Sequence, residues 1–242
     1  MTREELIAIV REELLDDVSD AVAGTDATVL AVSDARIARW LGEGEREACR
    51  RMGTLLMDAS SPFCAITLVA GQRDYPLDPR ILRMGRVLYG ATTLTWTTEA
   101  ALDRDSYGWR DYAAGAPQAF YLSRRRLFLD RAPSATEAGS ELRLIVWREP
   151  LAAMLTDPEI PATYHEALTH WAAYRYFLRP DPHTRDDARA AFYLQAFEQV
   201  FGPAKSAEML EFKLEDPGWT FVCNGGYTQS WHGATSTELT EF

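Results

Sequence analysis

The spacing of apolar residues divides the chain into helical, then extended, then again helical segments. Near the start, apolar residues recur at helical intervals from Leu6 to Val18. Thr2 and Glu5 have the T-x-x-E spacing of a capping box, in which each residue binds the other's backbone amide. This pattern predicts a first helix that runs from residue 2 to about residue 21.

A second helix is expected after Ser33 or Asp34, because either side chain can cap the free amides of a helix that begins there. Its predicted apolar stripe comprises Ile37, Trp40, Leu41, Ala48, Met52 and Leu55 or Leu56. Gly42 and Gly44 lie within this helix, with no preceding strand and no Walker lysine. They therefore indicate close packing against another helix and not a phosphate loop.

From Ser60 onward the apolar residues recur with a period of two, as in strands with one buried face. Residues 63–77 predict a strand, a turn at Gly71–Gln72 and a returning strand. Further strands are expected over residues 81–90, 93–97, 118–123, 126–132 and 141–149. Residues 99–112 predict a short helix and a loop, and residues 132–141 predict a polar hairpin tip.

Helical spacing returns after Pro161, where residues 162–178 carry a heavy apolar stripe that includes Leu168, Trp171 and Ala172. A fourth helix is expected from a cap at Thr184 to a stop at Gly202–Pro203. The predicted fold class is therefore α+β, a four-helix bundle with an inserted antiparallel β-sheet or sandwich domain and an extended C-terminal arm. The predicted boundaries are 1–59 and 154–203 for the bundle, 60–153 for the β domain and 204–242 for the arm.

Composition narrows the classes of function. The chain has 242 residues, 47% of them hydrophobic, which is enough to bury a sizeable core. Its formal net charge of −11 argues against a protein that grips nucleic acid by neutralising phosphates. Negative charge does suit a surface along which DNA must slide without being held.

Cysteine usage indicates a reducing compartment. Cys49, Cys64 and Cys223 are odd in number and lack CxxC or Cys/His spacing, so we expect three reduced thiols. The opening residues are acidic and amphipathic, unlike a signal peptide, and no apolar run is long enough to span a membrane. We therefore expect a protein made in the cytoplasm and not bound to a membrane.

One short stretch, residues 164–174, superficially resembles a zinc-protease motif through His165, Glu166 and His170. In HExxH the histidines are four residues apart, which places both imidazoles on one helix face. Here the spacing is five, so the two side chains lie about 140° apart around a regular helix. We therefore expect no metal and no cofactor, and two histidines that belong to the surface or the core. A metal-dependent hydrolase that also uses His183 is the alternative function.

Two other features are candidates for contacts. Arg124, Arg125 and Arg126 lie on the tight connection between two predicted strands, where they could contact an acidic neighbouring subunit or DNA in a channel, or face water as a solvated turn. The last forty residues have mixed periodicity and widely spaced aromatics on a Gly, Ser and Thr background. Ordering such a segment costs about 1–2 kcal/mol per residue, so we expect its aromatics to dock on a partner, and the alternative is a tail that packs on its own subunit. These are Trp219, Phe221, Tyr227, Trp231 and Phe242.

The order of elements and several short stretches resemble the head-to-tail adaptor proteins of tailed bacteriophages, also called head completion or connector proteins. The resembling stretches are "LIAIVREELLDD", "WLGEGEREACRR", "VAGQRDYPLDPRILRM", "YGWRD" followed by "GAPQAFYL" and "RLFLDRAP", and "EIPATYHEALTHWAAYRYF". The resemblance covers roughly residues 2–203. The chain departs from the family pattern at residues 20–32 and in its long C-terminal segment.

The resemblance implies a structural virion protein and not an enzyme. Such adaptors form a ring of twelve subunits in the neck of the virion, between the capsid and the tail. Their expected partners are the portal protein, neighbouring copies and a downstream tail or neck protein, and DNA passes through the ring without specific binding. The C-terminal segment is expected to reach the portal. A DNA-binding regulator, a third class, is disfavoured by the lack of a basic composition.

Overall fold

The computed structural model describes residues 1–15, 32–105, 108–152, 157–180, 185–215, 221–222 and 228–229. Helices come first along these residues, then mainly strands, then helices, so the mixed α+β class is confirmed. The chain divides into two compact units. Unit 1 comprises Met1–Cys64, Asp78–Gly85 and Ile145–Ser206, and unit 2 comprises Ala65–Leu77, Arg86–Leu144 and Ala207–Phe242. Each unit is thus assembled from separate stretches, and the predicted domain boundaries stay a prediction.

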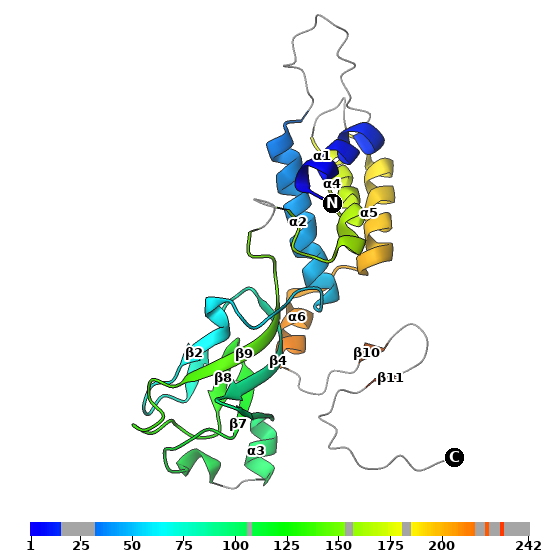
Figure 1. Cartoon of the computed structure of the whole chain (residues 1–242). Helices are drawn as coiled ribbons and strands as arrows, with labels where there is room; N and C mark the ends of the chain where they lie inside the picture. Colours follow the sequence, from blue (N-terminus) through cyan, green and yellow to red (C-terminus); the bar gives the residue numbers. More distant parts are fainter. Residues whose placement is uncertain are drawn as a thin grey trace, which may run out of the picture. The chain divides into compact units, whose positions relative to one another are not determined.

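Unit 1 contains α1 (Arg3–Ile9), the π-helix η1 (Val10–Leu15), α2 (Asp34–Met52), the 3₁₀ turn η4 (Ala162–Tyr164), α4 (His165–Phe177) and α5 (Asp187–Phe201) (Figure 1). The capping box at the start of α1 is confirmed: the Thr2 side chain accepts from the Glu5 amide, and the Glu5 side chain accepts from the Thr2 amide. The predicted end of this helix near residue 21 lies outside the described residues.

Helices α1, α2, α4 and α5 share one hydrophobic core. Helix α4 packs against both α2 and α5. Leu168 and Ala172 of the predicted stripe are fully buried, whereas Trp171 is only partly buried, and Ala173, which was not predicted, is also fully buried. The fully buried side chains of this core include Leu6, Val10, Ile37, Leu41, Ala48, Leu168, Ala172 and Phe197. Burying one such side chain contributes about 1.5–3 kcal/mol, so the shared core is the main source of stability in unit 1.

Helix α2 approaches α4 closely at Gly44. A Cβ atom added to Gly44 would lie 2.9 Å from the Cβ of Trp171, a separation that real Cβ atoms essentially never show. Only glycine fits at this crossing without moving one of the two helices. The predicted role of Gly44 in close helix packing is therefore confirmed.

The start of the fourth predicted helix is corrected. Helix α5 is capped by Asp186 and not by Thr184, since the Asp186 side chain accepts hydrogen bonds from the amides of Ala188 and Arg189. Aspartate and threonine are both good N-cap residues, so the sequence alone did not decide between two caps only two positions apart. The predicted stop is confirmed at Gly202, whose φ of 80° ends the helix.

The strands form two main sheets. The first has the order β1 (Met57–Asp58), β9 (Glu141–Arg148), β4 (Ile81–Tyr89), β5 (Thr92–Thr93), and β2 (Ala65–Thr67) also pairs with β9. The second has the order β3 (Asp74–Pro76), β8 (Arg126–Leu129), β7 (Ala119–Ser123), β6 (Thr95–Trp96). A short pair, β10 (Phe221–Val222) and β11 (Thr228–Gln229), is antiparallel. Strands β4 and β9 contribute residues to both units.

Two predicted hairpins are wrong. The turn at Gly71 exists, with φ of 76°, but β2 before it pairs with β9 while β3 after it pairs with β8. Likewise residues 132–141 connect β8 of one sheet to β9 of the other and are not the tip of a hairpin. In both places the connection crosses between sheets, which a period-two pattern cannot reveal because pairing partners are set by contacts distant in sequence.

One strand pair departs from the predicted antiparallel arrangement. Strands β6 and β7 are parallel, with Thr95 opposite Ala119 and Trp96 opposite Phe120. Parallel neighbours need a long crossover connection. Here residues 97–118 provide it, and they contain the predicted short helix, α3 (Glu99–Asp105), and the 3₁₀ turn η3 (Trp109–Asp111). Trp109 packs there with Leu102 and Tyr121 in a small second core.

We expected an extended arm from residue 204 onward. The first part of this segment is not extended. Residues Ala207–Glu215 form helix α6, which belongs to unit 2 and contacts β7. Leu214 is fully buried, and the Glu215 carboxylate accepts a hydrogen bond from the Arg124 amide. This part of the C-terminal region therefore packs on its own chain.

Candidate functional site

Helix α4 places the histidines of the HExxH-like stretch in different surroundings. His165 is buried, and its Nε2 lies 2.8 Å from the carbonyl oxygen of Ile160. Because a carbonyl oxygen can only accept, Nε2 carries the proton and cannot bind a metal in this arrangement. His165 thus joins the helix to the segment before it, as a core histidine with its hydrogen bond satisfied.

His170 lies on another side of α4, where its ring stacks on Tyr193 at 6.1 Å between centroids. Burial lowers the pKa of His170, which favours the neutral imidazole, although the carboxylate of Glu166 acts against this shift. Among the described residues, no three His, Cys, Asp or Glu side chains come together as metal ligands. His183 lies outside the described residues. The hydrolase alternative thus gains no support from the part of the chain that the structure describes.

Nucleophilic chemistry at the cysteines is also disfavoured. Cys49 and Cys64 are free thiols, and both are buried in unit 1. Burial raises the pKa of each thiol above its ordinary value, so the reactive thiolate is not populated at neutral pH. The expectation of reduced thiols is confirmed for these two, while Cys223 lies outside the described residues.

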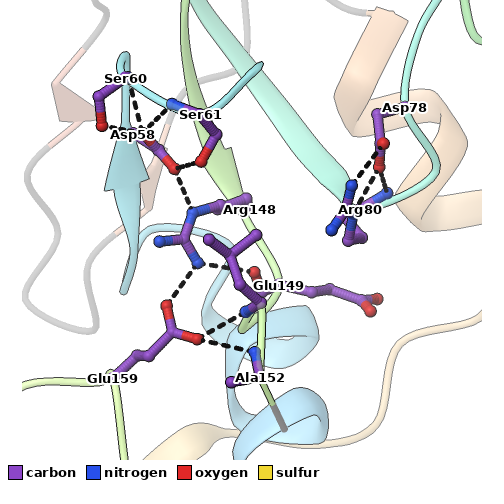
Figure 2. A network of polar contacts seen from close by, with 10 residues as sticks. Asp58, Ser60, Ser61, Asp78, Arg80, Arg148, Glu149, Ala152 and Glu159 are labelled. Atoms are coloured by element: carbon purple, nitrogen blue, oxygen red, sulfur yellow. Dashed lines mark hydrogen bonds and ion pairs between the residues drawn. The ribbon is translucent and has the colours of Figure 1, made fainter. Parts of the chain in front are cut away.

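A network of largely buried charged side chains links three segments of unit 1 (Figure 2). At its upper end in Figure 2, Asp58 is the last residue of strand β1 and accepts hydrogen bonds from Ser60 and Ser61, as an aspartate does in an Asx turn. Arg148, at the end of β9, donates from Nε to the same carboxylate. Burial acts to raise the pKa of Asp58, but hydrogen bonds from Ser61, Ser60 and Arg148 together hold that pKa well below its usual value.

The same arginine continues the network towards α4. Arg148 Nη1 donates to Glu159 Oε2 at 2.7 Å, and Glu159 Oε1 accepts from the amides of Leu151 and Ala152. Glu45 of α2 completes it by accepting from the amides of Glu159 and Ile160, at 2.6 and 3.2 Å. Desolvation raises the pKa of Glu45, which is only 1% exposed.

This network holds backbone in place and does not form a reaction centre. Glu45, Glu159 and Asp58 accept from six different backbone amides in addition to side chains, and Arg148 neutralises two of the three carboxylates. It fixes the turn that follows β1 and the residues between β9 and α4, and it ties the latter to α2. The network was not predicted from the sequence. The signal available was Asp58 followed closely by two serines, which is typical of an Asx turn.

The three arginines predicted on a tight connection are found there. Arg124 and Arg125 are the two central residues of the turn that joins β7 to β8, and Ser123 pairs with Arg126 across it. Both have positive φ, 49° and 57°, as in a type I′ hairpin turn, where Asn-Gly is usually found. Arg126 differs, because its Nε donates to Asp74 at 2.8 Å. Arg124 is exposed and Arg125 half-buried.

The aromatic residues proposed for docking lie mostly beyond what the structure describes. Trp219, Tyr227, Trp231 and Phe242 fall outside the described residues. Phe221 is the first residue of β10, where it stands opposite Gln229. The docking role of all five therefore stays a prediction.

Comparison with known proteins decides the family. The model of the family described as SU10 adaptor protein matches residues 1–210, which is most of the chain. The chain belongs to the SU10 adaptor protein family. This is a family of phage head-to-tail adaptors, so the resemblance drawn from the sequence is confirmed. No curated protein matches the chain.

Membership in the adaptor family points to a structural, non-enzymatic virion protein. The match includes the helical residues of unit 1 and the strands of unit 2 before residue 210, together with the polar network of this adaptor and its Arg124–Arg126 turn. It ends within α6, so the aromatics after residue 218 are outside it. None of the helices in the described part of the adaptor combines the length and apolar character needed to cross a bilayer.

Proposed function

We propose that this adaptor forms a ring in the neck of the virion, joins the portal to the tail and extends the channel through which DNA leaves the capsid. The observation that carries the proposal is the family match over residues 1–210. In this proposal the four helices of unit 1 form a bundle, the strands form a small sandwich, and twelve copies complete the ring. A ring of this kind needs a heterologous interface that closes on itself.

The charge of the chain supports a conduit for DNA. A formal net charge of −11 repels phosphates, so DNA can slide past without forming contacts that would hold it. At the β7–β8 turn, by contrast, Arg124 presents an exposed positive charge. We assign the Arg124–Arg126 turn a contact with a neighbouring subunit or with DNA in the channel, made mainly by Arg124 because Arg126 already binds Asp74.

The C-terminal residues after α6 supply the proposed contact with the portal. Trp219, Phe221, Tyr227, Trp231 and Phe242 are spaced along a polar segment, and aromatic side chains are the commonest anchors of protein interfaces. A ring multiplies each contact through avidity, so anchors of modest individual strength would suffice.

The test is co-sedimentation of purified adaptor with tail-less capsids that carry a portal. We expect the full chain to bind and to appear as a ring at the portal vertex in negative-stain images. Replacing Trp219 and Trp231 by alanine removes about 1.5–3 kcal/mol per anchor and lowers binding by tens-fold or more. A matched control is Phe192→Ala, which removes an aromatic that is 65% exposed on α5, outside the segment.

Failure of the full chain to bind portal-bearing capsids would overturn the proposed function. Equal binding by the double tryptophan variant would keep the adaptor role but move the portal contact elsewhere. Metal analysis of the purified protein tests the hydrolase alternative, because that enzyme would need a stoichiometric ion such as zinc.

A further inference from the structure

Helix α2 carries a row of arginines along its exposed side. Arg36, Arg39, Arg46 and Arg50 are all exposed, and at about 100° per residue they fall within an arc of about 80° around the helix. At about 1.5 Å per residue the row is about 21 Å long. We call these four residues the arginine row. Within the described part of the chain, Arg50 alone among them has an ion-pair partner, Glu149 at 2.6 Å.

Such a row is unusual in an acidic protein. Many other arginines of the described residues bind a carboxylate of their own chain, including Arg11, Arg51, Arg80, Arg126 and Arg148. Arg36, Arg39 and Arg46 differ from these arginines, because none of the three has an ion-pair partner among the described residues. The planar guanidinium fork matches carboxylates and phosphates, so the row fits an acidic surface on a partner.

The same unit presents an acidic surface on another helix. Glu4, Glu5 and Glu12 are exposed on α1 and η1, around the small exposed residue Ala8. The Glu4 side chain is 86% exposed. Glu4 and Glu12 are separated by about 12 Å along the helix, and Arg39 and Arg46 by about 10 Å. We call Glu4, Glu5 and Glu12 the acidic face. Its charge is opposite to that of the arginine row, and its spacing is similar.

We propose that the arginine row of one copy binds the acidic face of a second copy. This inference rests on the proposed ring and names a contact between its neighbouring subunits. The two surfaces lie on different helices, so the contact is heterologous: every copy offers one row and one acidic face. Repetition of a heterologous contact generates a ring when the rotation between copies closes.

Duplex DNA is a poorer partner for the arginine row. Glu43 lies within the same arc, between Arg39 and Arg46, and Glu47 lies at its edge. These two carboxylates are bound by Arg175 and Arg51, at 3.3 and 2.8 Å, but they still repel phosphates nearby. A net charge of −11 adds long-range repulsion. A protein surface of mixed charge accommodates such interleaved carboxylates.

The experiment measures self-association of the full chain by sedimentation velocity over a range of concentrations at low salt. We expect Arg39→Glu with Arg46→Glu to raise the dissociation constant about tenfold or more, because like charges then face each other. Glu4→Arg with Glu12→Arg has the same effect. Glu5 is left unchanged because it belongs to the capping box. A chain with all four substitutions regains self-association, since the two surfaces have exchanged sign.

The matched control is Arg104→Glu with Arg189→Glu, which changes net charge as much as the row variant. These side chains are 76% and 65% exposed and lie outside the row. We expect its self-association to equal that of the wild type. Circular dichroism melting checks that each variant is folded.

Three outcomes would overturn the contact: a wild type that stays monomeric at low salt, a row variant that associates like the wild type, or a fourfold variant that does not recover. Fluorescence anisotropy with a short DNA duplex provides the remaining comparison. In one outcome the wild type binds the duplex while the Arg39→Glu, Arg46→Glu variant does not, with self-association the same in both. That result would assign the row to DNA instead. Capsids are absent throughout, so failure here is separate from failure of the portal-binding experiment.

Discussion

Arg124 and Arg125 adopt a backbone conformation that is unfavourable for residues with a Cβ atom. Both occupy the left-handed region, where a side chain with a Cβ atom costs about 1–2 kcal/mol per residue. Asn-Gly in the same turn would avoid most of that cost. The contact proposed for this turn uses the charge that Asn-Gly would lack.

Replacing Arg124–Arg125 by Asn-Gly is expected to stabilise the protein by about 1–2 kcal/mol, because the turn keeps its shape and loses its strain. Urea unfolding followed by circular dichroism measures this change. Assembly on portal-bearing capsids is expected to weaken in the same variant. A variant that is more stable and assembles equally well would show that assembly does not need the charge of these two arginines.

Glu45 makes stability depend on pH in a direction opposite to that of most carboxylates. Its folded pKa is raised by desolvation, so its contribution is fully present below the unfolded value of 4.5 and is lost as pH rises through the folded pKa. We expect Glu45→Gln to remove this loss, which reaches at most about 1.4 kcal/mol per pH unit. Urea unfolding of both proteins from pH 4 to pH 8 tests it. Parallel curves for the two proteins would contradict the raised pKa.

Asp58 provides the opposite case within the same network. Its folded pKa is lowered, so its contribution is present above the unfolded value of 3.8 and is lost as pH falls through the folded pKa. Asp58→Asn leaves Arg148 buried with one partner fewer, which is expected to cost about 3–5 kcal/mol at neutral pH. The difference from the wild type should shrink below pH 3.8. A constant difference down to pH 2 would rule out this explanation.

At the scale of elements, the crossing of α2 and α4 depends on the missing side chain of Gly44. Gly44→Ala is expected to destabilise the protein by about 1–3 kcal/mol, since the new methyl group would overlap Trp171 unless the helices separate. The control is Gly115→Ala, because a Cβ there meets nothing within 4 Å. Comparing urea midpoints of the two variants tests the crossing, and equal midpoints would show that the helices adjust freely.

Because α6 packs on unit 2, a truncation meant to remove only the proposed portal anchors should begin after this helix. Removing residues 216–242 is expected to leave the described helices and the two main sheets folded but to abolish attachment to the portal, because the proposed anchors are removed while α6 stays on β7. Removing residues 205–242 also takes Leu214 away and should lower the melting temperature. Circular dichroism and capsid co-sedimentation measure both effects. Full capsid binding by the shorter truncation would place the portal contact elsewhere.

The sequence predicted elements better than it predicted their partners. Helical and period-two spacing located the second and third helices and most strands, because each pattern reports which side of one element is buried. It did not show that β2 and β3 join different sheets or that β6 and β7 are parallel. Those pairings depend on contacts between distant segments. The ion pair of Asp58 and Arg148 was missed for the same reason, since the two residues are 90 positions apart.

At the scale of the whole molecule, assembly is expected to be coupled to the portal. Isolated adaptor should be monomeric or weakly and reversibly associated, because the contact proposed between copies is electrostatic and exposed, and the C-terminal anchors find their surface only on the portal. Sedimentation at physiological salt, with and without capsids, measures this. A stable twelve-subunit ring in the absence of capsids would contradict it.

The division of unit 1 into three stretches also affects how the protein is made. Residues 86–144 separate its second stretch from its third, and a ribosome takes roughly 3–12 s to synthesise them at about 5–20 residues per second. During that interval Leu6, Ile37 and Leu41 have already left the ribosome, but α4 and α5, against which they pack, do not yet exist. The nascent chain therefore presents apolar side chains to chaperones before it can bury them, and the yield of soluble protein will depend on the chaperone capacity of the host cell.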